Sequence, residues 1–540
     1  MTMNNKYYYL CLLVCLILSG SFDVAFGQYQ KTFSSPLYDW PTAIDGVNSG
    51  GYVIGGSQLN TTWHPFMLRM DEKGQIMWSR TYHLAPGIDE TFNHLKSSKN
   101  AGALFVATGQ ADGHQGSMGS FDIYFVLIDD VGNAVKASRI GTPEGEFGMY
   151  VEEYSNSVGS GFVVVGRTVH SLSDNDLDIN VSITDDQGNL QKGIVLHYPG
   201  DQTPYAVEST SDGGFIITGT TELNKSCDGT VENVFIIKLG SKLNVEWNKV
   251  IDIKYGNSSS NDIGYAIKEG DHGEYYLTGV VKGTISPYPR HAFVAQLNKY
   301  GDVKYLYVYE HQYQAMEVRT LLNRTAPDGT IENTISGWVS TPLKAGVFKV
   351  DSKGDIIWSG LYDPETSKAE RMTHNRVSPG YAFTGRTFSG SYDIDIVEMD
   401  ENGSSVKSCQ YEFKLEKVEA SFCEEKLALT NITHMRQLSV VPIQTDIILD
   451  ESRCDASAAN MNLESQSLKL YPVPAQDQIT IDTQDDVVSV EVRDMSGELQ
   501  KMFQPSRNKS YDISSLGKGM YIVIIRKSRN GSERLVLVKE

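Results

Sequence analysis

The sequence predicts an all-β protein: a seven-bladed β-propeller followed by a small C-terminal β-sandwich of the immunoglobulin-like kind. The first observation is a repeat, because a short apolar run ending in glycine returns every 48 to 60 residues, close to the period of propeller blades. The second is a change of character after residue 467, where four β-like runs lack that repeat. The repeated glycines are Gly55, Gly109, Gly166, Gly219, Gly279, Gly337 and Gly385.

The fourth repeat shows the unit most clearly. Asp212-Gly213-Gly214 is a tight turn, since glycine takes the positive φ that hairpins need. The apolar run 215–218 follows, then the apolar run 234–239 and a strand carrying Trp247. With the β-like run before the turn, each unit has four strands. Small antiparallel sheets with tight turns favour radial packing over a stacked solenoid.

The third strand of most repeats ends in an acidic turn closed by glycine, as in residues 71–74. The fourth repeat differs, because Leu243 stands where the other repeats have glycine. Trp78, Trp247 and Trp358 fall at one place on the following strand. We therefore expect them at equivalent positions in blades one, four and six.

The run Ser211-Asp-Gly-Gly-Phe-Ile-Ile-Thr-Gly219 and the acidic turns followed by tryptophan resemble the propeller repeats of many secreted bacterial proteins. The resemblance covers roughly residues 40–410 and implies architecture rather than function. We assign residues 28–415 to the propeller and residues 416–467 to a bridge and linker.

Two segments compete for the last strand of the ring. Residues 29–33 resemble the fourth strand of the first repeat, so the N-terminus could complete the seventh blade and remove its edge. Residues 404–413 also follow the seventh repeat as a fourth strand would. Both pairings remain open at this point.

The N-terminal residues 1–27 have the pattern of a secretory signal. Lys6 supplies a charged start, the apolar core 7–18 is too short to span a membrane, and Ala25-Phe26-Gly27 offers small residues before a cleavage at Gln28. No other stretch is apolar enough for a transmembrane segment. We expect the mature chain to be exported through the periplasm to the outer cell surface or the medium.

Composition excludes some partners and leaves the disulfides open. The net charge of -20 and pI near 5.0 argue against nucleic acid, which requires a basic patch. The mature chain keeps four cysteines, which allow three pairings in an oxidising compartment. They are Cys227, Cys409, Cys423 and Cys454.

No motif for a metal, a cofactor or catalysis stands out. The eleven histidines have no metal-ligand spacing, and there is no nucleophile elbow, P-loop or dinucleotide fingerprint. Asp122, Asp178 and Asp393 share one place ahead of the third strand, where they are expected to pin a turn. We predict no cofactor, no metal and no catalytic residue.

The C-terminal residues 468–540 resemble a known sorting domain. They closely resemble the C-terminal sorting domain of the type IX secretion system of Bacteroidetes, with Val473 departing from the usual asparagine. The resemblance implies recognition by the outer-membrane translocon, then removal and surface attachment. The matching residues are Tyr471, Pro472, Pro474, Asp494, Gly497, Leu516, Gly519, Tyr521 and Lys539.

These features favour a binding or interaction protein over a propeller enzyme that hydrolyses or cleaves glycans, since no acid–base pair stands out. The short turns of every repeat lie on one face, so the long connections lie on the other, where binding groups tend to sit. The alternative is that these loops are tolerated insertions. We predict contacts to a glycan or protein ligand from Trp63, His64, His114, Asp174, Asp176 and Tyr288.

Overall fold

The computed structural model divides into two compact units, Met1–Ala456 and Ser457–Glu540. It describes residues 28–454 and 469–539 apart from short internal gaps: 86, 99–104, 114–118, 170–175, 223–231, 256–260, 283–289, 312–314, 341–342, 363–365, 388–391, 407–409, 448, 472–474, 483–486, 495–498, 505, 507–508 and 528–531. The predicted signal, residues 1–27, lies outside the described residues. Within them every regular element is a strand, so the all-β class is confirmed. The described part of the chain has no helix of the length and apolarity needed to cross a membrane.

The first unit contains seven sheets, each built on four antiparallel strands. The first three sheets comprise β2 (Tyr38–Gly46), β3 (Tyr52–Leu59), β4 (Trp63–Met70) and β5 (Ile76–His83); β6 (Glu90–Ser97), β7 (Phe105–Asp112), β8 (Phe121–Ile128) and β9 (Ala134–Gly141); and β10 (Gly145–Asn156), β11 (Gly159–Val169), β12 (Leu177–Asp185) and β13 (Leu190–His197). One bridge between Phe121 and Gly145 links the second and third sheets.

The next three sheets repeat this order. They comprise β14 (Gln202–Ser209), β15 (Phe215–Glu222), β16 (Glu232–Leu239) and β17 (Val245–Lys254); β18 (Asn261–Glu269), β19 (Tyr275–Lys282), β20 (Arg290–Leu297) and β21 (Val303–Glu310); and β22 (Met316–Thr325), β23 (Ile331–Ser340), β24 (Leu343–Val350) and β25 (Ile356–Tyr362).

The seventh sheet joins the two ends of the unit. It takes β26 (Thr366–His374), β27 (Gly380–Thr387) and β28 (Ile394–Asp400) from the end of the repeats and β1 (Gln30–Ser34) from the N-terminus. The backbone of β1 pairs with β28, with Gln30 opposite Val397 and Phe33 opposite Ile394. The N-terminal segment therefore takes the fourth place, and residues 404–413 do not.

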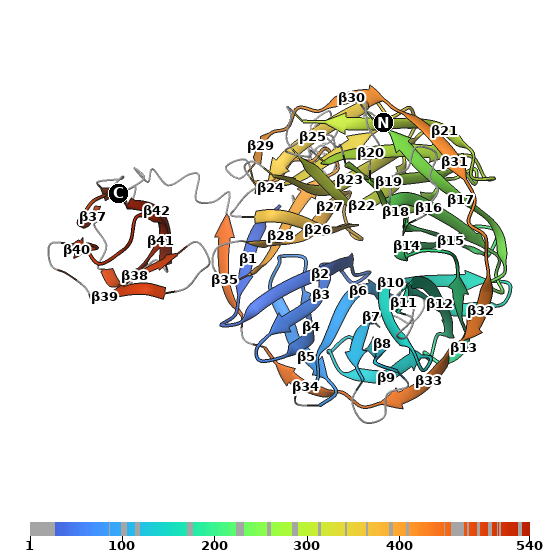
Figure 1. Cartoon of the computed structure of the whole chain (residues 1–540), viewed down its shortest axis with the longest axis horizontal. Helices are drawn as coiled ribbons and strands as arrows, with labels where there is room; N and C mark the ends of the chain where they lie inside the picture. Colours follow the sequence, from blue (N-terminus) through green and yellow to red (C-terminus); the bar gives the residue numbers. More distant parts are fainter. Residues whose placement is uncertain are drawn as a thin grey trace, which may run out of the picture. The chain divides into compact units, whose positions relative to one another are not determined.

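The innermost strands form a closed ring. β2 contacts β6, and each inner strand contacts the next through β10, β14, β18, β22 and β26, which contacts β2 again (Figure 1). Strand directions alternate, so the turns between first and second and between third and fourth strands lie at one end of the ring. We call this the short-turn end and the opposite end the long-loop end.

A belt of short strands runs around the outside of the ring (Figure 1). Each strand pairs antiparallel with the fourth strand of one sheet, in the order six, five, four, three, two, one, seven. Residues 410–454 therefore add strands to the seven sheets, and the domain boundaries at 415 and 467 stay predictions. The belt strands are β29 (Gln410–Glu412), β30 (Glu416–Glu419), β31 (Ser421–Glu425), β32 (Asn431–His434), β33 (Arg436–Val440), β34 (Ile443–Asp446) and β35 (Asp450–Cys454).

Cys423, on the belt strand β31, forms a disulfide. Its partner is not among the side chains that the structure describes. A bond from the belt is consistent with the oxidising compartment expected from the sequence.

The repeated glycine has one physical cause. Each inner strand bulges by one residue, and the glycine of the second strand faces the residue before the bulge, as Gly219 faces Pro204. A Cβ on Gly219 would collide with the carbonyl oxygen of Thr203. In the first sheet the glycine in this place is Gly56, which faces Pro41. The assignment of Gly55 from sequence is therefore wrong by one residue.

The three tryptophans occupy equivalent positions, as predicted. Each lies on the fourth strand opposite a basic residue of the third, in the pairs Arg69–Trp78, Lys238–Trp247 and Lys349–Trp358. Each indole ring packs over the glycine that closes the acidic turn of the next sheet, so a side chain there would meet the ring. These glycines are Gly132, Gly301 and Gly403.

Leu243 replaces such a glycine in the fourth sheet. It takes a φ of 62°, a conformation that costs a side chain about 1 kcal/mol or more, and it is 1% exposed in the core between sheets three and four. The fourth strand of the third sheet has Lys192 where sheets one, four and six have tryptophan, and its Nζ donates to Lys242 O at 2.7 Å. The leucine thus fills space that no ring covers.

The second unit has two sheets. One is β36 (Lys469–Tyr471), β37 (Gln478–Asp482) and β40 (Ser510–Asp512); the other is β39 (Leu499–Phe503), β38 (Val487–Asp494), β41 (Gly519–Lys527) and β42 (Ser532–Lys539). Both contribute to one core, which includes Ile479, Val490, Val523 and Leu537.

Exchange at Leu243 tests this account. Leu243→Gly relieves about 1 kcal/mol of backbone strain but leaves a cavity that costs roughly 2–5 kcal/mol, so the free energy of unfolding should fall by about 1–4 kcal/mol in denaturant melts. The double variant Lys192→Trp, Leu243→Gly restores the ring-over-glycine contact and should recover much of the loss. A single variant more stable than the native chain would contradict the packing role of Leu243.

Candidate functional site

Charged side chains meet on the axis of the ring. Every inner strand carries its bulge at the same place, and the third residue beyond the bulged one is charged in five of the seven strands. We call these five residues the axial layer. They are Asp45, Lys96, Glu152, Glu208 and Lys268, and Leu322 and Thr373 complete the circle.

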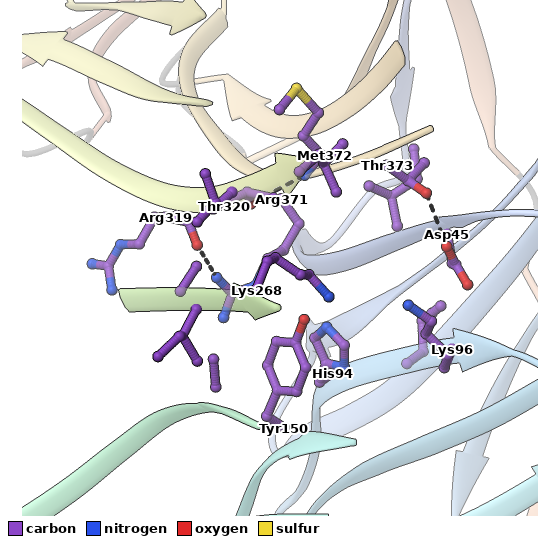
Figure 2. Close-up of a pocket in the computed structure, with 17 residues that line it drawn as sticks. Asp45, His94, Lys96, Tyr150, Lys268, Arg319, Thr320, Arg371, Met372 and Thr373 are labelled. Atoms are coloured by element: carbon purple, nitrogen blue, oxygen red, sulfur yellow. Dashed lines mark hydrogen bonds between the residues drawn. The ribbon is translucent and has the colours of Figure 1, made fainter. Parts of the chain in front are cut away.

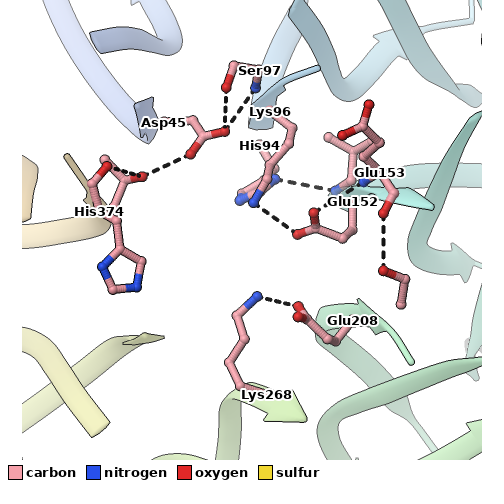
Figure 3. Close-up of polar contacts among 12 residues, drawn as sticks. Asp45, His94, Lys96, Ser97, Glu152, Glu153, Glu208, Lys268 and His374 are labelled. Carbon is pink, nitrogen blue, oxygen red and sulfur yellow. Dashed lines mark hydrogen bonds and ion pairs between the residues drawn. The ribbon is translucent and has the colours of Figure 1, made fainter. Parts of the chain in front are cut away.

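The axial layer is held by ion pairs and hydrogen bonds (Figure 3). Lys96 Nζ lies 3.1 Å from Glu152 Oε2, and Lys268 pairs with Glu208. Asp45 Oδ2 accepts hydrogen bonds from both the backbone N and the Oγ of Ser97, each at 2.9 Å. The two ion pairs therefore tie neighbouring inner strands together, β6 to β10 and β14 to β18.

Burial and pairing set the ionisation of this layer. Burial lowers the pKa of Lys96, but Glu152 and Asp45 more than offset it, so the pKa lies above the ordinary value. Burial likewise lowers the pKa of Lys268, and Glu208 is the largest of the influences that raise it above normal. For Asp45, burial raises the pKa, and Lys96 and Arg376 reverse the shift. These groups are therefore ionised at neutral pH.

A cavity of about 40 Å³ lies on the axis beside this layer. Its wall includes His94, Tyr150, Lys268, Thr320 and Arg371, which come from five different inner strands (Figure 2). The rings of His94 and Tyr150 are stacked, with centroids 3.6 Å apart. Burial, together with Arg371 and Lys96, lowers the pKa of His94 well below normal, so its ring is neutral.

The axis also carries a cation–aromatic cluster toward the long-loop end. The Arg319 guanidinium carbon lies 4.1 Å from the ring centre of Tyr265 and 5.2 Å from that of Trp338, and Nη2 lies 2.7 Å from Glu317 Oε1. Tyr205 packs on Tyr265 with ring centres 4.8 Å apart. The guanidinium is thus fixed by stacking and by one carboxylate.

A second group of aromatic rings, which we call the aromatic cluster, lies at the long-loop end between sheets seven and one. Arg386 sits 3.5 Å above the Trp40 ring centre and 5.2 Å from that of Tyr392. Trp63 meets Trp40 at 6.1 Å, and Tyr38 meets Tyr392 at 5.9 Å. Tyr38 is 46% exposed and Trp40, Trp63 and Tyr392 are half-buried, so ring surface remains available.

The predicted ligand residues lie in different parts of the structure. Trp63 belongs to the aromatic cluster, whereas His64, the next residue of β4, packs against His83 with ring centres 4.7 Å apart. Asp176 is half-buried just before β12. His114, Asp174 and Tyr288 lie outside the described residues. The structure therefore brings Trp63 together with Trp40, Tyr392 and Arg386, which sequence reasoning missed.

Another hollow, of about 280 Å³, lies at the short-turn end. Its wall is formed by the ends of β22 and β26 and the start of β27, including Arg324, His374 and Tyr381. The predicted assignment of ligand contacts to the long-loop end thus has a structural competitor.

Three carboxyl groups with raised pKa values stand at one repeated position. Burial raises the pKa of Asp39 to about 6, of Glu90 to about 8 and of Glu146 to about 7. Each lies three residues before the bulge and accepts a backbone N–H from the chain entering its sheet, at 3.0–3.1 Å. Because the same buried contact recurs in three sheets, we attribute the raised pKa values to a structural role and not to an acid–base pair.

Asp122 and Asp178 also occupy equivalent places, two residues before the partner of the repeated glycine. Asp178 Oδ1 accepts from the backbone N of Tyr198 at 3.0 Å, whereas Asp122 pairs with Arg139 at 3.3 Å. Among the described residues, no group of three or more His, Cys, Asp and Glu side chains is arranged to hold a metal ion.

The predicted sorting residues fall in the second unit. Tyr471 ends β36, Asp494 pairs with Tyr521 through the backbone of β38 and β41, and Gly519 opposite Lys539 begins the pairing of β41 with β42. The side chains of Leu516 and Tyr521 pack against the core, and Lys539 is buried. Pro472, Pro474 and Gly497 lie outside the described residues.

Acid should destabilise the ring through His374. Burial, helped by Arg376, lowers the pKa of His374 to about 4, against about 6.5 in the unfolded chain. The folded state thus binds fewer protons between these values, so stability should fall by roughly 2–3 kcal/mol as the pH drops from 6.5 to 4. His374→Gln should flatten this slope in melts across pH, while His272→Gln, on an exposed turn, should not. Equal slopes for both variants would count against it.

The comparisons with solved structures are weak. A chain of the hydrazine synthase of Kuenenia stuttgartiensis has a TM-score of 0.42 and 9% identity, covering 68% of this chain and 97% of that one. The extracellular domain of a one component system from B. thetaiotaomicron has a TM-score of 0.17 and 9% identity, covering 94% and 76%. At these scores neither similarity carries an argument. No curated protein matches the chain.

The second unit does match a family model. Residues 469–539 match the secretion system C-terminal sorting domain. This match indicates export by the type IX secretion system and interaction with its machinery. The C-terminal unit of this chain is therefore a secretion system sorting domain.

Proposed function

We propose that this chain is an exported β-propeller binding protein, whose seven sheets are the blades and whose sorting domain delivers it to the cell surface or the medium. The sorting-domain match supports the delivery. The closed ring of inner strands supports the propeller architecture. After export, the sorting domain is removed and the ring remains as the working part.

The aromatic cluster is the binding site in this proposal, and its ligand is a glycan. Trp40, Trp63 and Tyr392 present partly exposed ring faces around Arg386, and most of the other large aromatic rings of the unit lie in its core. Half-exposed aromatic groups with a fixed charged centre are typical of recognition surfaces. The site lies at the long-loop end, where a rigid ring displays variable loops.

Enzymatic activity on the glycan is the weaker alternative. Near the cluster, Asp39 has the raised pKa expected of an acid, but its carboxylate already accepts from Gln58 Nε2 at 2.7 Å and from Ser35 N at 3.1 Å. A catalytic acid must reach its substrate, and Asp39 is 1% exposed. The aromatic cluster therefore supports binding better than cleavage.

Alanine exchanges test the binding site. Trp40→Ala and Trp63→Ala should each weaken glycan binding at least about fivefold, since loss of a stacking ring costs about 1 kcal/mol or more. Tyr300→Ala, which removes a 62% exposed ring from a short turn, should have no effect. The measurement is a polysaccharide screen followed by calorimetry, with product analysis to detect cleavage. Loss of binding only from short-turn variants would overturn the site.

Deletion tests the delivery. A chain lacking residues 457–540 should fold and stay in the periplasm, because the two units are compact by themselves and the signal for the translocon is gone. Fractionation of cells and medium, with the full chain as control, measures the outcome. Efficient appearance of the truncated chain in the medium would contradict the role of the sorting domain.

A further inference from the structure

The axial cavity is lined by one carboxylate, Asp45, and by several cations; Asp45 interacts with Lys96 and Arg376, and not with Arg371. Four basic residues line the cavity: Lys96, Lys268, Arg319 and Arg371. Three of them have a carboxylate partner, in the pairs Lys96–Glu152, Lys268–Glu208 and Arg319–Glu317. The fourth, Arg371, forms no ion pair with any carboxylate in the described part of the chain.

The contacts of Arg371 leave most of its donors unused. Its Nη1 donates to the carbonyl oxygen of Arg319 at 2.5 Å, and its guanidinium carbon lies 5.6 Å from the ring centre of Tyr150. A guanidinium has five N–H donors. Arg371 is half-buried, and the surrounding protein lowers the pKa of its guanidinium by removing part of its hydration.

Neutral donors face the same space. Thr320 Oγ1 accepts from the backbone N of Met372 at 3.2 Å, so its hydroxyl hydrogen can donate elsewhere. Tyr150 also lines the cavity (Figure 2). A phenol and a hydroxyl beside a guanidinium form a typical set of anion ligands.

The volume limits the ligand. A water molecule requires about 10–15 Å³ of such space, so the cavity of about 40 Å³ holds about three waters. A sugar ring or a nucleotide does not fit. A halide or the carboxylate of formate or acetate does.

We propose that the axial cavity binds one small monovalent anion, a halide or a short carboxylate, against the guanidinium of Arg371. The anion balances the unpaired charge and joins inner strands on several sides of the ring. Because the site exists only when the ring is closed, the anion binds the folded state and stabilises it. This inference is independent of glycan binding at the aromatic cluster.

Anion exchange tests the site in the full chain. The protein is dialysed into gluconate, an anion too large for the cavity, and then melted in gluconate, bromide, chloride, formate or acetate at constant ionic strength. We expect the melting temperature to rise by about 3 °C once the small anion exceeds its Kd about a hundredfold. Crystals grown in bromide should show an anomalous peak beside Arg371.

Variants separate this site from general salt effects. Arg371→Gln should abolish the shift and, in gluconate, melt no lower than the native chain, since it removes a half-buried charge that has no carboxylate partner among the described residues. Arg371→Lys should keep part of the shift. Arg80→Gln, which removes a cation paired with Asp446 at the outer belt, should keep all of it. If Arg371→Gln does not fold, bromide diffraction and the Arg371→Lys melts decide. An unchanged shift in Arg371→Gln, no shift in the native chain, or no bromide peak would overturn the proposal.

Discussion

The pairing of β1 with β28 is the contact on which the ring depends. Without it the seventh sheet ends at β28. Sheets seven and one would then be joined only by the packing of their side chains, as between β26 and β2. Thr32 Oγ1 donates to Asp395 Oδ1 at 2.5 Å across this pairing, and Phe33 is fully buried. Strand pairing between the two ends of the repeats converts a row of sheets, each with a free side, into a circle. Everything on the axis requires that circle, because each axial group faces groups from sheets far away in sequence.

The bulge in each inner strand connects the architecture to the site. It brings the inner backbone so close to the second strand that only glycine fits, as at Gly219 and Gly279, and it resets which side chains face the axis. One distortion therefore explains both the repeated glycine and the axial layer. The charges of the layer then cost little, because Lys96 and Lys268 find carboxylates on neighbouring strands. Arg371 follows the bulged residue of β26 and also lines the axial cavity. Its charge has no carboxylate partner among the described residues.

Sequence reasoning predicted the repeated strands better than the contacts between residues far apart in the sequence. The repeat around Gly219, the tryptophans and the sorting residues depend on local spacing, which a sequence displays directly. The belt was not predicted, because its strands have only three to five residues and a strand at the outer edge needs little apolar alternation. The axial layer was not predicted, because the bulge interrupts the period of two. Of the aromatic cluster only Trp63 was predicted, since Trp40 and Tyr392 lie at opposite ends of the repeats and meet only after the ring closes.

The belt adds a second strand pairing at the seam where the ring closes. Its strands cover the outer edge of every sheet, and exposed edges are sites of unwanted pairing. The last belt strand, β35, pairs with β1 over residues Gln30–Ser34, so β1 is held between β28 and the end of the belt. A strand paired on both sides must lose both sets of hydrogen bonds to leave. Opening the ring at its seam therefore requires the belt to detach there as well, and the chain that forms the belt is the one that continues into the sorting domain. The seam of the ring is thus paired with the last belt strand, which ends at Cys454, ahead of the sorting domain that begins at residue 469.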